Sequence, residues 1–176
     1  MALKLSHAFI NVADLERVVP FYTDLLGFQV TDRGVIGDGV GVVFMSQDPE
    51  NHHQIALAER LEPGEGPRNL GHVAFRMETL DDLRALKARL ASHGVEIARE
   101  VSHGNTWSLY FADPEDNGVE CFVDTPFHVS QPQGKPTDIG LDDDALLGQT
   151  EADFSGEPDF VPYAEWQARF RRRLAE

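Results

Sequence analysis

The chain contains an internal repeat, and this repeat constrains the fold more than any other feature of the sequence. The segment LSHAFI at 5–10 recurs as LGHVAF at 70–75. An amphipathic stretch follows each copy, and then a glycine-led segment, GFQV at 27–30 and GVEI at 94–97. Self-similarity of this kind indicates two copies of one supersecondary unit, which we call modules.

Each module reads as β-α-β-β-β. The alternation of AFINV at 8–12 predicts a first strand, with Asp14 placed to cap the helix that follows and Gly27 placed to end it. Pro20 in the middle of this helix predicts a kink or an early end. The second helix is predicted at about 80–92, with an apolar stripe made of Leu83, Leu86 and Leu90. The other strands are predicted near 28–35, 40–46, 52–58, 95–101, 106–112 and 118–123.

These patterns divide the chain into one two-module domain and a tail. The domain is expected at 1–125, with modules at 3–59 and 69–125. The stretch 62–69, rich in glycine, proline and charge, is the expected linker between them. Residues 126–176 form a C-terminal extension of different composition.

The extension has an acidic part and an aromatic part. Residues 138–159 contain eight acids and no base, which favours a solvated strand or loop over core. From Pro162 onward the spacing predicts a helix whose apolar stripe must be buried, either on its own domain or, second, in a subunit interface. This stripe consists of Tyr163, Trp166, Phe170 and Leu174.

Composition excludes several classes of partner. A net charge of −15 over 176 residues argues against binding nucleic acid or an anionic membrane surface, since both are polyanions. No apolar stretch is long enough to span a bilayer, and residues 2–6 do not resemble a signal peptide. The single cysteine, Cys121, cannot form an internal disulfide, so a reducing cytoplasm is the expected location.

Three polar residues occupy related positions in the two modules. Strand alternation directs His7 and His72 to the face opposite the apolar rows of their strands. A lone strand histidine is usually a hydrogen-bonded core residue, but Glu120 lies between apolar neighbours, where an unpaired charge is costly. Glu120 is also the counterpart of Ala56 in the first module. Two histidines and one carboxylate from separate strands are the ligand set of a non-haem iron(II) facial triad, so these three are the candidate metal ligands.

Three segments carry a resemblance to a known family. They are the paired histidines of HHQIAL at 52–57, the stretch from His103 to Asp113-Pro114 that ends at Glu120, and the tail segments 131–136 and 164–166. With the paired modules, they resemble the vicinal oxygen chelate superfamily, and within it the one-domain type I extradiol ring-cleavage dioxygenases. The resemblance implies an α+β fold, in which both modules pair into one mixed-sheet half-barrel around a metal cavity.

The resemblance also implies residue roles. His53 would be the catalytic acid/base, with His52 the second choice, although the alternative is a surface histidine and alternation directs it away from the Ala56 face. Tyr110 and His103 would line the cavity and bond the substrate oxygens, although a strand tyrosine is more often packing. Three aromatic residues could line the pocket or, equally, belong to the hydrophobic core, namely Phe9, Phe44 and Trp107.

The implied activity is cleavage of a catechol-type ring with O2. The metal would be Fe(II), with Mn(II) also compatible with the ligand set, and the alanine at position 56 would leave a coordination site open. The partners would be a small aromatic diol and O2, and the assembly a homodimer or larger homo-oligomer. The sequence departs from the family pattern in two ways. The best-known members have four modules whereas this chain has two, and Asp116 replaces an expected glycine or proline.

Two alternatives keep the fold and change the function. A Mn(II)-dependent thiol transferase of the fosfomycin-resistance type would use the same ligands and need a basic pocket, for which Arg76 and Arg99 are candidates. A non-catalytic small-molecule-binding member of the superfamily would need no metal. Metal content and oxygen uptake separate the three functions.

Overall fold

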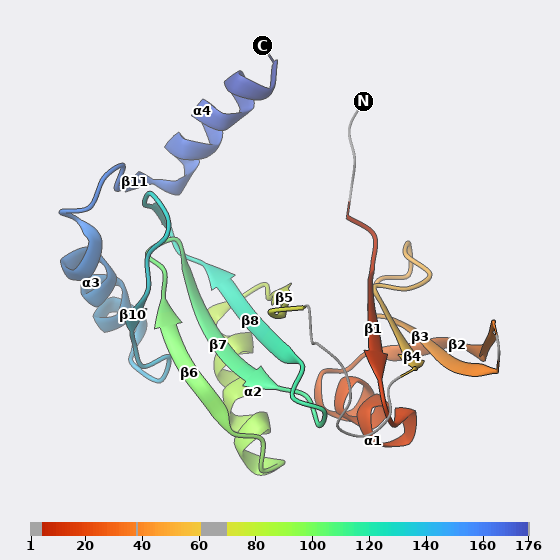
Figure 1. Cartoon of the computed structure of the whole chain (residues 1–176). Helices are drawn as coiled ribbons and strands as arrows, with labels where there is room; N and C mark the ends of the chain where they lie inside the picture. Colours follow the sequence, from red (N-terminus) through yellow and green to blue (C-terminus); the bar gives the residue numbers. More distant parts are fainter. Residues whose placement is uncertain (1–4, 38, 61–69, 176) are drawn as a thin grey trace. The chain divides into compact units, whose positions relative to one another are not determined.

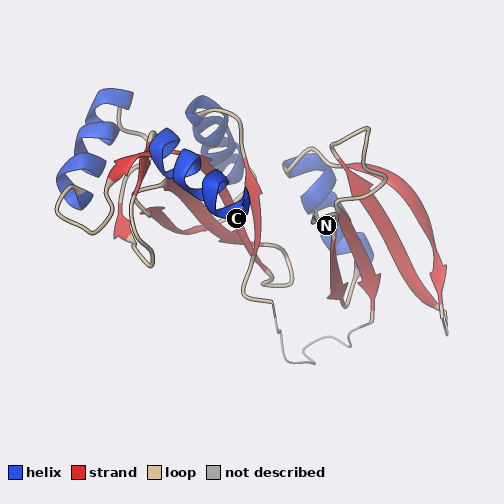
Figure 2. Ribbon diagram, turned by 90° about the horizontal axis from the view of Figure 1, so that it is seen from above, coloured by secondary structure: helices blue, strands red, loops and turns tan. Residues whose placement is uncertain are grey.

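The computed structural model describes residues 5–37, 39–60 and 70–175 (Figure 1). The described chain forms two compact units. The first unit comprises Met1–Val73 with Ala112–Gly118, and the second comprises Ala74–Phe111 with Val119–Glu176. Figure 2 shows both units with helices in blue and strands in red. The expected linker at 62–69 lies outside the described residues.

A four-stranded sheet forms the first unit, in the order β1-β4-β3-β2. β1 pairs with β4 in parallel, and the other pairs are antiparallel. The strands are β1 (Ala8–Val12), β2 (Gln29–Ile36), β3 (Val40–Ser46) and β4 (Ile55–Glu59). The alternation predicted at 8–12 is confirmed, since Ile10 and Val12 are buried and Phe9 is exposed.

The first helix begins and ends for the predicted local reasons. The Asp14 side chain accepts a hydrogen bond from the Arg17 amide and caps α1 (Leu15–Pro20). Proline has no backbone N–H, and its ring clashes with the carbonyl of the residue four positions earlier. The regular helix therefore stops at Pro20 and continues as a π-helical turn, η1 (Phe21–Leu25). Gly27 then reverses the chain with a φ of +82°.

The second unit repeats this strand order. Its five-stranded sheet runs β10-β6-β7-β8-β5, so β5-β8-β7-β6 corresponds to β1-β4-β3-β2. The strands are β5 (Val73–Arg76), β6 (Ile97–Ser102), β7 (Thr106–Ala112), β8 (Gly118–Asp124) and β10 (Lys135–Pro136). The mixed α+β class expected from the repeat is therefore confirmed.

α2 (Leu80–Ser92) packs on one face of the second sheet, behind it in Figure 1. Thr79 and Asp82 form a reciprocal capping box at its start, and the predicted leucine stripe is buried. The alternate residues of β8 that point away from Glu120 are also buried, namely Val119, Cys121 and Val123. One face of the sheet is thus core, and the other carries the polar residues.

A turn at Ala112–Gly118 holds the start of β8. The Asp113 carboxylate accepts hydrogen bonds from the amides of Glu115 and Asn117. Asp116 has a φ of +59°, a left-handed conformation that glycine adopts most easily and that aspartate tolerates. Asp116 therefore takes up at this turn a conformation that glycine, one of the two residues of the family pattern, adopts without strain.

The extension is more ordered than its composition predicts. The acidic segment contains α3 (Asp143–Phe154), with Leu146, Thr150 and Phe154 buried, so the prediction of a solvated strand or loop was wrong. The acids occupy the cap and exposed face of this helix, while its few apolar residues are enough to pack it.

The end of the chain is a short hairpin and a helix. The strands β9 (Phe127–His128) and β11 (Val161–Pro162) pair antiparallel, and α4 (Tyr163–Ala175) follows. The helix predicted from Pro162 is confirmed, and Trp166 stacks on His128 with ring centroids 4.8 Å apart. The predicted burial of its stripe is met only in part, because Tyr163 and Trp166 are half-buried while Phe170 and Leu174 are exposed. None of the described helices is long and apolar enough to cross a bilayer.

Candidate active site

Three predicted site residues meet on the open face of the second sheet. Glu120 lies in β8, and Tyr110 lies on the neighbouring strand β7. The Tyr110 hydroxyl donates to Glu120 Oε1 at 2.8 Å, and His103 Nε2 lies 2.9 Å from the same hydroxyl. Glu120 is only 8% exposed. A carboxylate, a phenol and an imidazole therefore form one hydrogen-bonded chain.

The far end of this chain fixes the histidine ring. His103 Nδ1 lies 2.5 Å from the Gln133 carbonyl oxygen, which can only accept, so Nδ1 carries a hydrogen. The Tyr110 hydroxyl has a single proton, and it is directed to Glu120 Oε1 in this arrangement. Burial, reinforced by the hydrogen bond to Glu120, raises the pKa of Tyr110 to about 12. Tyr110 thus remains a neutral phenol that can donate a hydrogen bond.

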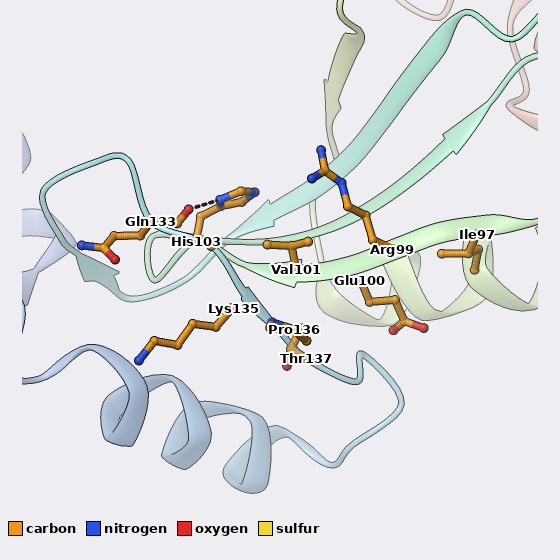
Figure 3. A pocket seen from close by; sticks show the side chains of 10 residues that line it. Ile97, Arg99, Glu100, Val101, His103, Gln133, Lys135, Pro136 and Thr137 are labelled. Atoms are coloured by element: carbon orange, nitrogen blue, oxygen red, sulfur yellow. Dashed lines mark hydrogen bonds between the residues drawn. The ribbon is translucent and has the colours of Figure 1, made fainter.

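A hollow of about 680 Å³ lies beside His103, along the edge where β6 meets β10. In Figure 3, Arg99 and His103 rise from one side of β6, whereas Glu100 points to the other. The Arg99 guanidinium lies over the Tyr110 ring, 4.2 Å from its centroid. This contact follows from the sheet register, because Arg99 is directly opposite Tyr110. A small organic molecule fits a space of this size.

The first unit brings together two other predicted residues. The rings of His7 and His53 have centroids 4.4 Å apart, and Phe44 packs 5.0 Å from His53. β4 begins at Ile55 and not at 52 as predicted, so His53 belongs to the preceding loop and escapes the strand alternation. Burial, followed by the charges of His7 and His52, lowers the pKa of His53.

The paired histidines have different surroundings. His52 Nε2 lies 3.1 Å from the Asp32 carboxylate on β2, and the side chain is exposed. His53 Nδ1 lies 3.0 Å from His52 Nδ1 and is half-buried beside His7. Only His53 adjoins a candidate metal ligand, which agrees with the preference for it.

The candidate metal ligands are distributed over both units. His7 lies just before β1 in the first unit, His72 lies just before β5, and Glu120 lies in β8 of the second unit. β5 and β8 are neighbours in the sheet. Within either unit as described, no three His, Cys, Asp or Glu side chains are close enough together to hold a metal ion. The triad therefore stays a prediction.

Trp107 and Cys121 lie on the face of the second sheet opposite Tyr110 and Glu120. Trp107 is buried, and its indole N–H donates to Thr150 of α3 at 2.9 Å, so of the two alternatives given for it the place in the core holds. Strand alternation explains this, since positions 107 and 110 have opposite parity. Burial, followed by the Glu120 charge, raises the pKa of Cys121 to about 12, so this thiol stays protonated.

Sequence reasoning missed two partners of the site. The Gln133 backbone carbonyl orients His103, and Asp32 holds His52. A backbone acceptor leaves no signal in residue type, although the 131–136 segment that contains Gln133 was already part of the resemblance. Asp32 lies on an exposed strand with no distinguishing pattern.

Comparison with known proteins assigns the family. Residues 4–121 match the model of the Glyoxalase/Bleomycin resistance protein/Dioxygenase superfamily, and the chain belongs to this superfamily. It is 31% identical over 155 residues to biphenyl-2,3-diol 1,2-dioxygenase 2 of Rhodococcus globerulus, covering 82% of this chain and 78% of that protein.

Two further relatives are longer than the matched region. The chain is 33% identical to catechol-2,3-dioxygenase of Bacillus subtilis (strain 168), over 69% of this chain and 42% of that enzyme. It is 34% identical to biphenyl-2,3-diol 1,2-dioxygenase 3 of Rhodococcus globerulus, over 69% and 63% respectively. The match thus spans less than two thirds of these two enzymes.

The fold has solved counterparts. A glyoxylase/bleomycin resistance protein/dioxygenase domain from Frankia sp. EAN1pec aligns with a TM-score of 0.61 at 26% identity, over 71% of this chain and 100% of that one. A fosfomycin resistance protein, FosX, from Listeria monocytogenes, in complex with Mn(II), aligns with a TM-score of 0.54 at 21% identity, over 71% and 95%. At that identity the second likeness concerns the fold alone.

Proposed function

We propose that the protein is an extradiol dioxygenase that opens a catechol-type ring with O2 at a metal centre formed by His7, His72 and Glu120. The observation that carries this proposal is the hydrogen-bonded chain of His103, Tyr110 and Glu120 on the open sheet face. The relatives named as diol dioxygenases support the reaction class.

The donor set fits Fe(II). Two imidazoles and one carboxylate make up the facial triad of non-haem iron oxygenases, and Mn(II) accepts the same donors. Ala56 is fully buried at the position equivalent to Glu120 and offers no fourth ligand. When bound, the iron would supply the electron transfer between diol and O2 that side chains cannot provide.

The side chains would move and hold protons around the substrate. His53 is the acid/base, because its ring adjoins His7 and an imidazole can both accept a diol proton and return it. The Phe44 ring packs edge-on against the His53 ring, with centroids 5.0 Å apart. Tyr110 and His103 would hydrogen-bond the substrate oxygens, and Tyr110 also orients the Glu120 carboxylate.

Oxygen uptake tests this function. The protein is loaded anaerobically with Fe(II), mixed in air with catechol or 2,3-dihydroxybiphenyl, and followed by oxygen consumption and by absorbance of the yellow ring-opened product. Wild type should consume O2 and turn yellow. His53→Ala should keep its iron and lose turnover, whereas Glu120→Gln should lose iron. Exposed controls, His93→Ala and Glu96→Gln, should match wild type.

Two results would overturn the proposal. Full iron content and turnover in Glu120→Gln would remove this residue from the metal site. Absence of oxygen uptake with either diol, despite bound iron, would favour the thiol transferase or the non-catalytic binding protein. The transferase would need a basic pocket, and one of its two candidate cations, Arg76, is already paired with Asp124 at 3.5 Å.

A homodimer or larger assembly and a cytoplasmic location also remain predictions. The exposed end of the α4 stripe, with Phe170 at 39% and Leu174 at 72% exposure, is the surface that a subunit interface would cover. Light scattering of wild type and of Leu174→Glu would test this.

A further inference from the structure

The lysine and arginine side chains of the second unit differ in their partners. Five of them form ion pairs with carboxylates. Lys87, for example, lies 2.7 Å from Glu100. Arg99 forms no ion pair with a carboxylate among the described residues, and its contact is the Tyr110 ring. The five paired cations are Arg76, Arg84, Lys87, Lys135 and Arg169.

The hollow beside β6 has a net positive lining for this reason. Its single acid, Glu100, is neutralised by Lys87 and also accepts the Ile139 amide at 2.9 Å. Lys135 lies 3.7 Å from the Asp153 carboxylate, so its charge is also offset. Among the residues that line the hollow, Arg99 is left as the cation without a carboxylate partner in the described part of the chain, although the net charge of the chain is −15.

Tyr110 connects this charge to the candidate metal ligand. Its hydroxyl is bonded to Glu120, and its π-face carries the Arg99 guanidinium. A diol bound at the metal would therefore lie one phenol ring away from the guanidinium. A substituent that projects from the diol ring toward β6 would meet the planar N–H donors of Arg99, which match a carboxylate.

We propose that Arg99 is a specificity-determining residue that selects catechols with an anionic, carboxylate-bearing side chain. The inference rests on the proposed dioxygenase function and adds the class of substituent. The relatives are named for biphenyl-diol and catechol, whose rings carry no charged substituent. A guanidinium stacked on an aromatic ring is already desolvated on one side, which strengthens its attraction to an anion.

Matched acid and ester substrates test the proposal. The probes are 3-(2,3-dihydroxyphenyl)propionate and 3-(3,4-dihydroxyphenyl)propionate, each compared with its methyl ester, which has similar size and no charge. For wild type we expect kcat/KM and anaerobic calorimetric affinity to favour at least one acid over its ester by about 10-fold or more. Arg99→Gln should lower this acid-to-ester ratio about 10- to 100-fold, mainly through KM. Arg99→Lys should give an intermediate ratio.

The control is Arg76→Gln, which removes a cation that Asp124 already neutralises and should leave the ratio as in wild type. Equal preference for acid and ester in wild type, or an unchanged ratio in Arg99→Gln, would overturn the proposal. Anaerobic binding separates the two proposals. Arg99-dependent binding of an acid without any oxygen uptake would mean that the dioxygenase assignment fails while the anion subsite stands.

Discussion

Removing the Glu115 carboxylate should destabilise the first unit by several kcal/mol. This side chain is 6% exposed and accepts hydrogen bonds from the backbone amides of Ala13 at 2.7 Å and Asp14 at 2.9 Å. Each is a charge-assisted bond from a backbone amide to the buried carboxylate, worth about 1.5–3 kcal/mol. Glu115→Ala should therefore cost about 3–6 kcal/mol, and Glu115→Gln, which keeps one acceptor, about half of that.

The ion pair at the same site should contribute little. Arg17 lies 3.1 Å from Glu115, but its side chain is 55% exposed, and solvent screens the pair to about 0–1 kcal/mol. Urea unfolding of Glu115→Ala, Glu115→Gln and Arg17→Ala measures the three contributions. Glu16→Gln makes the same chemical change at a side chain that is 91% exposed, and should match wild type. If Arg17→Ala cost as much as Glu115→Ala, the ion pair and not the backbone amides would hold the turn, and the reasoning would be refuted.

Three further predictions concern the second unit. Gly104→Ala should cost about 2–4 kcal/mol in urea unfolding, because its φ is +80° and an added Cβ would lie 2.5 Å from a buried methyl group. Gly94→Ala, with a φ of +70° and open space, should cost only about 1 kcal/mol, and equal losses would contradict the packing argument. Thr79→Ala should lower stability by about 1 kcal/mol, since it removes the capping box of α2, and an unchanged midpoint would argue against it. Burial outweighs the neighbouring Asp159 and lowers the pKa of His128 below 6.5, so the unfolded chain takes up the proton first and stability is lost as pH falls through 6.5. His128→Phe should therefore lose less thermal stability than wild type between pH 7.5 and 5.5, and parallel losses would count against this assignment.

Much of the fold could be predicted because the signals are local. The capping aspartate, the leucine stripe of α2 and the strand at 106–112 all depend on neighbours within a few positions, and the structure confirms each of them. α3 could not be predicted in the same way, because its acids indicate a solvated chain. Only the packing of Leu146, Thr150 and Phe154 makes it a helix of the core.

The site residues also fall into those that the sequence could predict and those that it could not. Residue type and repeat position were enough to name His103, Tyr110 and Glu120 as candidates, and the structure brings these three together. Residue type left Trp107 open between pocket and core, and the structure places it in the core. The position of His53 depends on where β4 starts. β4 starts at Ile55, and this boundary could not be predicted from the sequence.

The sequence by itself determined the two modules, the succession of helix and strands along each of them and the chemical types of the candidate ligands, because the repeat and the alternation are properties of the chain. Tertiary structure decided which side chains meet. Register across β6 and β7 sets Arg99 over Tyr110, and a loop 30 residues away supplies the carbonyl that orients His103. Such contacts join segments that are distant along the chain, and residue pattern carries no information about them until the strands are aligned.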